Sequence, residues 1–194
     1  LEAAENVCAD LGAGLQEGAP SAGLPNTASL DPDEILDLLT QLVDKSLVTP
    51  IEGTYEAPGG TASSETRYKM LETIRQYARE KLHESGCGAA VRDRHLAYYL
   101  LLAEEAEPYL RRGSQVTWLD RLDAEMDNIR LALEWSLARR VDEGLRLAAS
   151  LLWFWHIRGH GREGVDWLKQ LLAAGQNRTG PDSPPGSRLT GARA

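Results

Sequence analysis

The side chains best suited to bind a metal are two histidines and an acid near the end of the chain. His156 and His160 are four positions apart, and Glu163 follows them. Histidines at this spacing share one face of a continuous helix, and with a carboxylate they could bind zinc. However, Gly159 and Gly161 flank His160, and such a sequence is typical of a turn between helices. We therefore expect a turn with surface histidines here and no metal site.

The remaining candidates for chemistry do not form a catalytic set. No nucleophile is placed for His95 to activate as a base, so we expect a packing or hydrogen-bonding histidine. Cys8 and Cys87 lack metal-ligand spacing and are expected to be reduced thiols. The phosphate-binding motif G-x-x-x-x-G-K-[S/T] is absent. We expect no catalytic residue, no cofactor and no enzymatic activity in this chain.

Charge is distributed unevenly along the chain. The 194 residues carry a formal net charge of −8 at pH 7. Residues 1–86 hold 6 Lys or Arg against 15 Asp or Glu, a net charge of −9, whereas residues 87–194 hold 15 against 14. Phosphates repel so acidic a segment, and DNA binding through it is not expected.

The chain carries no sign of membrane insertion or secretion. No apolar run approaches about 18 residues, the length of a spanning helix. The chain begins at Leu1 without an initiator Met, a basic stretch or a cleavage site. We expect part of a longer cytoplasmic protein.

Residues 1–86 have the element order of a winged-helix domain that lacks its N-terminal part. Asp31-Pro32 is a strong helix start, Pro50 restricts its strand to an edge, and Gly86 is a natural helix end. The expected elements are a helix over 1–9, a loop over 10–30, a helix over 31–46, a strand over 47–51, a Gly-rich tip over 52–65, a strand over 66–70 and a helix over 70–85. Along this last helix an apolar face is formed by Leu71, Ile74, Tyr77, Ala78 and Leu82.

Residues 87–174 are expected to form four antiparallel helices with tight turns. Apolar residues recur at helical spacing over 89–107, 114–138, 141–156 and 162–173. Residues 127–138 overlay 162–173 at an offset of 35, close to the 34-residue period of tetratricopeptide repeats (TPRs). The fold class is therefore mainly α, a partial winged helix with a two-stranded wing followed by a TPR-like helical-hairpin array. Residues 175–194 have no apolar period and are expected to be disordered.

Four separated blocks resemble one bacterial family. They are LLTQLVDKSLV at 38–48, RYKMLETIRQYAREKL at 67–82, VRDRHLAYYLLLAEEAEP at 91–108 and WLDRLDAEMDNIRLALEW at 118–135. Their order resembles the STAND-type (AP-ATPase or NB-ARC-like) signalling NTPases of LuxR- and SARP-type transcriptional regulators. The resemblance covers residues 1–174 and implies an ATP- or ADP-binding domain upstream, in the same chain, that the winged helix clamps.

The resemblance also implies a nucleotide-sensing position at the start of the last winged-helix helix. The family's Met-His-Asp element matches Met70-Leu71-Glu72, where leucine replaces the histidine that contacts phosphate. A leucine cannot donate a hydrogen bond, so Glu72 or Arg75 would have to take part in nucleotide contact. The alternative is that Met70 and Leu71 only pack the helix onto the strands.

A binding groove on the helical array is the second candidate site. All five tryptophans lie in the second half of the chain. Trp153 and Trp155 are two positions apart and therefore face different sides of a helix, so one could join a groove while the other packs in the core. The candidate interaction residues are Tyr109, Arg111, Arg112, Trp153 and Trp155.

These observations favour a non-catalytic regulatory or sensor segment of a STAND-type ATPase regulator. A protein or small-molecule effector would bind the repeats, and helix 70–85 would couple the repeats to the nucleotide state. Two alternatives stay open, a DNA-binding winged-helix regulator and a free-standing TPR-like scaffold for protein interaction.

Overall fold

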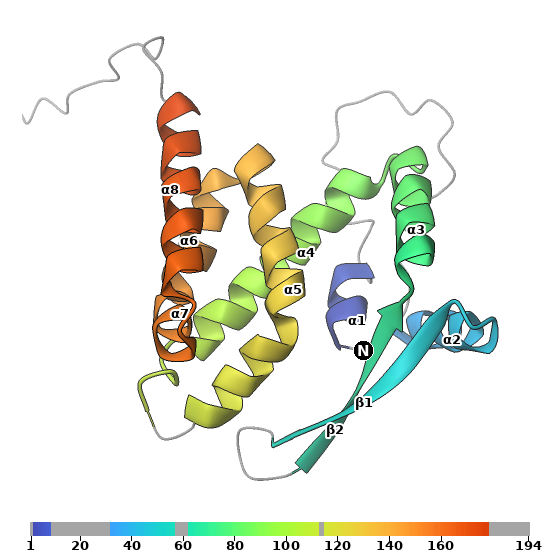
Figure 1. The fold of residues 1–194 in the computed structure, drawn as a ribbon. Coiled ribbons are helices and arrows are strands. Elements are labelled where there is room, and N and C mark those ends of the chain that lie inside the picture. The colour runs from blue at the N-terminus through green and yellow to red at the C-terminus, as the bar shows by residue number, and fades with distance from the viewer. Residues whose placement is uncertain (1, 9–31, 57–61, 113–114, 179–194) are drawn as a thin grey trace, which may run out of the picture.

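The computed structural model describes residues 2–8, 32–56, 62–112 and 115–178, which are mainly helical (Figure 1). The elements in chain order are α1 (Glu2–Cys8), α2 (Pro32–Asp44), β1 (Val48–Glu56), β2 (Ala62–Met70), α3 (Glu72–Glu84), α4 (Gly88–Ala106), α5 (Gln115–Arg139), α6 (Val141–Ser150), α7 (Leu152–Arg158) and α8 (Gly161–Arg178). This order confirms the expected fold class, a partial winged helix followed by a helical array. Across the described residues, no helix combines the length and apolar character needed to span a membrane.

The β-hairpin is longer than the sequence predicts. β1 and β2 pair antiparallel from Val48 opposite Met70 to Glu56 opposite Ala62, nine residues on each strand. The expected tip over 52–65 is therefore wrong, and its central residues 57–61 lie outside the described part. The outer half of the ladder contains Tyr55 as its one large apolar residue, so no two-residue apolar alternation marks it in the sequence.

The helix expected over 141–156 is divided into α6 and α7 at Leu151. The hydrogen-bond ladder nevertheless continues, since the Leu151 amide donates to Leu147 O at 3.2 Å and the Trp155 amide to Leu151 O at 3.0 Å. Ser150 Oγ donates to Arg146 O at 3.1 Å, a local contact that bends helices. This hydroxyl bond lies one residue before the division at Leu151, where the sequence has neither Gly nor Pro.

Glycines end two helices as expected. Gly86, just after α3, has φ of 74°, and Gly159, just after α7, has φ of 79°, a backbone region that favours glycine. α8 continues to Arg178, past the expected boundary at 174. The rest of the expected tail and the expected loop over 10–30 lie outside the described residues.

The hydrophobic core lies almost wholly in the array. Side chains of α4 to α8 and Leu110 form one buried cluster, in which Trp118 and Trp155 are 2% and 1% exposed. By contrast, the buried apolar side chains among the described residues of 2–86 are Val7, Ile35 and Val48. The array, α4 to α8, therefore has its own core, whereas the described part of residues 2–86, which we call the hairpin half, buries little apolar surface.

α3 is the least buried of the longer helices. None of its residues is buried, and Tyr77 is 59% exposed. Leu71, which precedes the helix, is 68% exposed, so the expectation that it packs onto the strands is wrong. Helical spacing predicted α3, and on its apolar face Leu71 and Tyr77 are exposed while the other three residues are partly buried. α3 lies at the edge of the fold, away from α8 (Figure 1).

Gly144 of α6 lies where this helix closely approaches α5 and α8. A Cβ there would lie 2.7 Å from Leu171 Cδ2 and 2.7 Å from Ser136 Cβ. Gly144→Ala should therefore lower the free energy of unfolding by about 1–3 kcal/mol, because the packed helices must separate. Urea denaturation monitored by circular dichroism measures this. Gly161→Ala is the matched control, since a Cβ there meets no atom within 4 Å. Equal destabilisation by the two changes would contradict the account.

Candidate functional site

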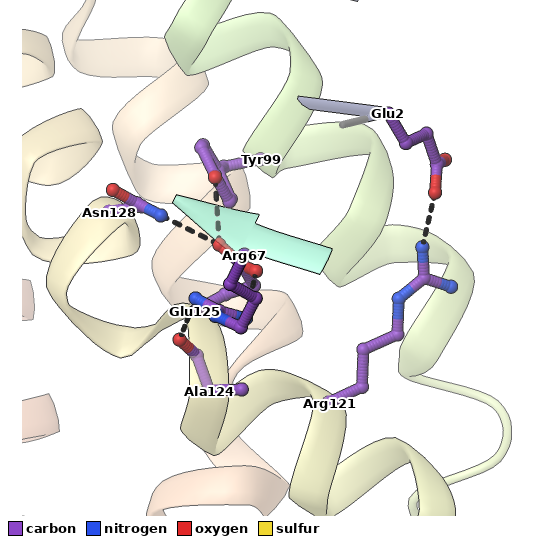
Figure 2. Close-up of polar contacts among 7 residues, drawn as sticks. All are labelled: Glu2, Arg67, Tyr99, Arg121, Ala124, Glu125 and Asn128. Atoms are coloured by element: carbon purple, nitrogen blue, oxygen red, sulfur yellow. Dashed lines mark hydrogen bonds and ion pairs between the residues drawn. The ribbon is translucent and has the colours of Figure 1, made fainter. Parts of the chain in front are cut away.

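One arginine of the hairpin forms hydrogen bonds with the helical array, and β1 also lies against α5. Arg67 of β2 points toward α5, where its Nη1 donates to Glu125 Oε1 at 2.6 Å (Figure 2). Its Nη2 donates to the carbonyl oxygen of Ala124. The guanidinium thus uses two nitrogens on neighbouring residues of α5, which fixes both the position and the direction of the side chain.

Glu125 receives donors from three elements. Besides Arg67 of β2, Tyr99 of α4 donates its hydroxyl to Oε2 at 2.8 Å and Asn128 of α5 donates Nδ2 to Oε2 at 2.7 Å. The Glu125 side chain is only 14% exposed. A carboxylate this far from water is stable only when paired and hydrogen-bonded, and three donors provide this.

Tyr99 is held as a hydrogen-bond donor in this cluster. Its side chain is 1% exposed. Burial, and next the negative charge of Glu125, raise the pKa of Tyr99 well above its ordinary value. The phenol therefore stays protonated at neutral pH and serves as a neutral donor to Glu125.

His95 lies beside this cluster on α4. Its ring is 4.7 Å from the Tyr99 ring, centre to centre. Burial lowers the pKa of His95 below its ordinary 6.5, while the charge of Glu125 opposes that shift. The imidazole is thus a neutral packing group at pH 7, as expected from the sequence.

A second polar contact ties α1 to the array. Arg121 of α5 donates to Glu2 at 3.2 Å (Figure 2), and its guanidinium lies 5.3 Å from the centre of the Trp118 ring. Together the contacts of Arg67 and Arg121 attach two segments of the first half to the same helix. We call the group Arg67, Tyr99, Ala124, Glu125 and Asn128 the junction.

Sequence reasoning missed the junction, although one signal was present. Leu122, Glu125 and Ile129 are spaced by three and four residues, which places a carboxylate on the buried side of an apolar helix. Such an acid requires a partner, but the partner is 58 residues away in sequence, so the pairing was not predictable.

The residues proposed to contact nucleotide lie elsewhere. Glu72 and Arg75 form an ion pair with each other at 3.1 Å in the first turn of α3, with side chains 71% and 42% exposed. The exposed Leu71 precedes them. The structure thus brings Glu72 and Arg75 together on an open surface, and their nucleotide contact stays a prediction.

The candidate interaction residues are partly brought together. The Arg111 guanidinium lies 4.6 Å from the Trp153 ring centre, and Tyr109 stacks on the buried Trp118 at 5.3 Å. Arg112 is exposed beside them. Trp155 is 1% exposed and packs in the core, so it does not line a groove, and the two tryptophans face different sides as expected.

The histidine-rich segment is a turn, as expected. α7 ends at Arg158, the left-handed Gly159 follows, and α8 begins at Gly161. Glu163 accepts two hydrogen bonds from Arg130, at 2.7 Å and 3.0 Å. These bonds lower the pKa of Glu163, so its carboxylate serves to join α5 to α8.

Replacing the junction arginine should weaken the fold. Arg67→Gln removes a charged donor from a mostly buried carboxylate, and we expect the free energy of unfolding to fall by about 1–2 kcal/mol. Arg75→Gln removes an exposed pair and should change it by less than about 0.5 kcal/mol. Chemical denaturation of both variants gives the comparison. Indistinguishable losses would show that the junction is worth no more than a surface pair.

His95 predicts a pH dependence of stability. Burial lowers the pKa of His95 in the folded protein below 6.5. The contribution of the neutral imidazole to the free energy of unfolding is therefore fully present above pH 6.5 and is lost as pH falls through the folded pKa. The unfolding free energy should therefore decline with acidity from about pH 6.5. His95→Gln should flatten that decline, whereas His83→Gln, at an exposed position of α3, should keep it. A decline of the same slope in His95→Gln would contradict this assignment.

Comparison with known proteins finds relatives among regulators. The chain is 40% identical over 146 residues to proteins described as "Putative HTH-type transcriptional regulator" from Mycobacterium tuberculosis and Mycobacterium bovis. The match covers 75% of this chain but 15% of each relative, so the chain spans a small part of their length. No family model matches the chain, and no solved structure matches it. The chain is thus similar to one segment of these regulators.

Proposed function

We propose that this chain is a non-catalytic regulatory segment of a transcriptional regulator of the STAND ATPase type. The relatives' name supports regulation of transcription. The resemblance of the four sequence blocks supports the finer assignment. In this proposal the winged-helix half clamps a nucleotide-binding domain elsewhere in the same protein, where ATP or ADP binds, and the array receives a protein or small-molecule effector.

The junction is the observation that supports coupling between the two halves. Arg67 of the hairpin is bonded to Glu125 and Ala124 of α5, which is anchored in the array core. A displacement of α5 therefore moves or breaks these bonds, and this provides a physical route from the array to the hairpin. α3, which the sequence favoured as the coupling element, has no buried residue and provides a weaker connection.

Two discrete states follow from this route. With the Arg67–Glu125 bonds made, the hairpin is held in one orientation on the array. With them broken, Glu125 keeps two donors, Tyr99 and Asn128, and the hairpin keeps the contacts of β1 with α5. An effector that binds one state more tightly shifts the equilibrium by its difference in affinity.

The surface of α2 argues against DNA contact by this segment. In a winged helix this element would be the recognition helix, yet Asp33, Glu34, Asp37 and Asp44 are all exposed on it. A gel shift at low salt tests this alternative, because electrostatic binding is strongest there. We expect no shifted band, and a shift that disappears with added salt would instead support DNA binding.

Nucleotide exchange in the full-length regulator tests the proposal. Arg67→Gln should change the release rate of a fluorescent ADP analogue by about threefold or more, a loss of about 0.7 kcal/mol of coupling. Arg75→Gln, on the exposed face of α3, is the matched control and should leave the rate unchanged. An unchanged rate in a folded Arg67→Gln protein would overturn the coupling. A full-length sequence without a P-loop would favour the free-standing scaffold.

A further inference from the structure

A cleft separate from the junction lies where α3 faces α4 and α5. Its volume is about 420 Å³, within the range of small-molecule sites and too small for a protein partner. Each of the three helices contributes two or more side chains to its lining, among them Arg79, Leu82, Arg92, Leu131, Glu134 and Trp135. The cleft therefore sits between the hairpin half and the array.

The charge of this lining is opposite to that of the chain. Arg79 and Arg92 outnumber Glu134, giving a local net charge of +1 in a protein of net charge −8. Among the residues that the structure describes, neither arginine has a carboxylate partner. Arg92 instead lies 5.1 Å from the centre of the Trp135 ring. Guanidinium groups left without an acid in a concave site are suited to bind an anion.

The aromatic wall of the cleft is held rigid. Trp135 donates Nε1 to Asp93 Oδ1 at 2.8 Å, and Asp93 in turn accepts from Arg140 Nη2 at 3.0 Å. The indole is thus fixed before a ligand arrives, so its ordering costs no further entropy. Leu82 and Leu131 supply apolar surface beside it. A fixed aromatic ring with apolar neighbours favours a flat, apolar ligand body.

We infer that this cleft binds a small organic anion with a flat apolar body. Arg92 and Arg139 lie over the Trp135 ring at 5.1 Å and 5.4 Å from its centre. The anionic group contacts Arg79 and Arg92, and the body packs between Leu82 and Leu131 against the part of Trp135 that lines the cleft. Because α3 otherwise buries no residue, the ligand adds contacts that tether α3 to α4 and α5. The inference needs no nucleotide switch, so it stands or fails separately from the proposed function.

The test uses 1-naphthyl phosphate as the probe and 1-naphthol as its uncharged counterpart. Ligand-observed NMR titration of the 194-residue chain measures both dissociation constants. The phosphate should bind about tenfold or more tightly than the naphthol, since a hydrogen-bonded charge adds that much affinity. Amide hydrogen exchange locates the binding site, because bound 1-naphthyl phosphate should slow the exchange of the α3 amides and leave that of the α8 amides unchanged.

Substitutions that remove a positive or a negative charge from the lining distinguish binding in this cleft from attraction to the charge of the whole protein. Arg92→Gln should weaken phosphate binding about tenfold, while Glu134→Gln should strengthen it about twofold to fivefold by removing the opposing charge. Arg162→Gln is the matched control, since it also removes one positive charge but lies on α8, across the array from α3 (Figure 1). Circular dichroism confirms that each variant is folded.

Three results would overturn the inference. They are the absence of saturable phosphate binding up to millimolar concentration, equal affinity for the two probes, and equal weakening by Arg92→Gln and Arg162→Gln. The last result would show attraction to the charge of the whole protein.

Discussion

A carboxylate on the buried side of α5 requires donors, and Glu125 receives them from β2, α4 and α5 itself. The hairpin supplies one of these donors. Arg67 reaches Glu125 only if β2 runs close to α5, and the second bond to Ala124 restricts its approach further. One mostly buried charge thereby helps to hold a segment near the start of the chain on helices far along it, together with the contacts of β1 with α5 and of α1 with α4.

Polar contacts contribute to holding the hairpin half on the array, because the two halves differ in how much apolar surface they bury. α4 to α8 share a continuous core, whereas the described part of the first half buries Val7, Ile35 and Val48. Apolar packing therefore contributes less to holding this described part in place than it does in the array. Hydrogen bonds and ion pairs can be exchanged for others at small net cost, so a polar junction suits a segment that must change position. In the proposed regulator, this would let an effector on the array alter the hairpin without unfolding either half.

Local signals predicted most of the elements, but not how they meet. Pro32, Gly86 and Gly159 correctly marked helix ends, because their backbone preferences act without tertiary contacts. The outer hairpin was missed because its ladder lacks apolar alternation, and the division between α6 and α7 at Leu151 because neither Gly nor Pro marks it. Glu125 could have been recognised as a buried acid, but its pairing with Arg67 depends on tertiary structure. Of the residues proposed as sites, Trp155 is buried in the core. The cleft around Trp135 is lined by three helices, and no single sequence motif includes all three.

A double-mutant cycle between Arg67 and Glu125 tests the central claim most directly. The free energy of unfolding would be measured for the parent, Arg67→Gln, Glu125→Gln and the double variant. If the junction joins the halves, the two substitutions should couple by about 1–2 kcal/mol, because each removes the same bond. Effects that add within about 0.3 kcal/mol would show that these side chains do not interact energetically, and would contradict the account.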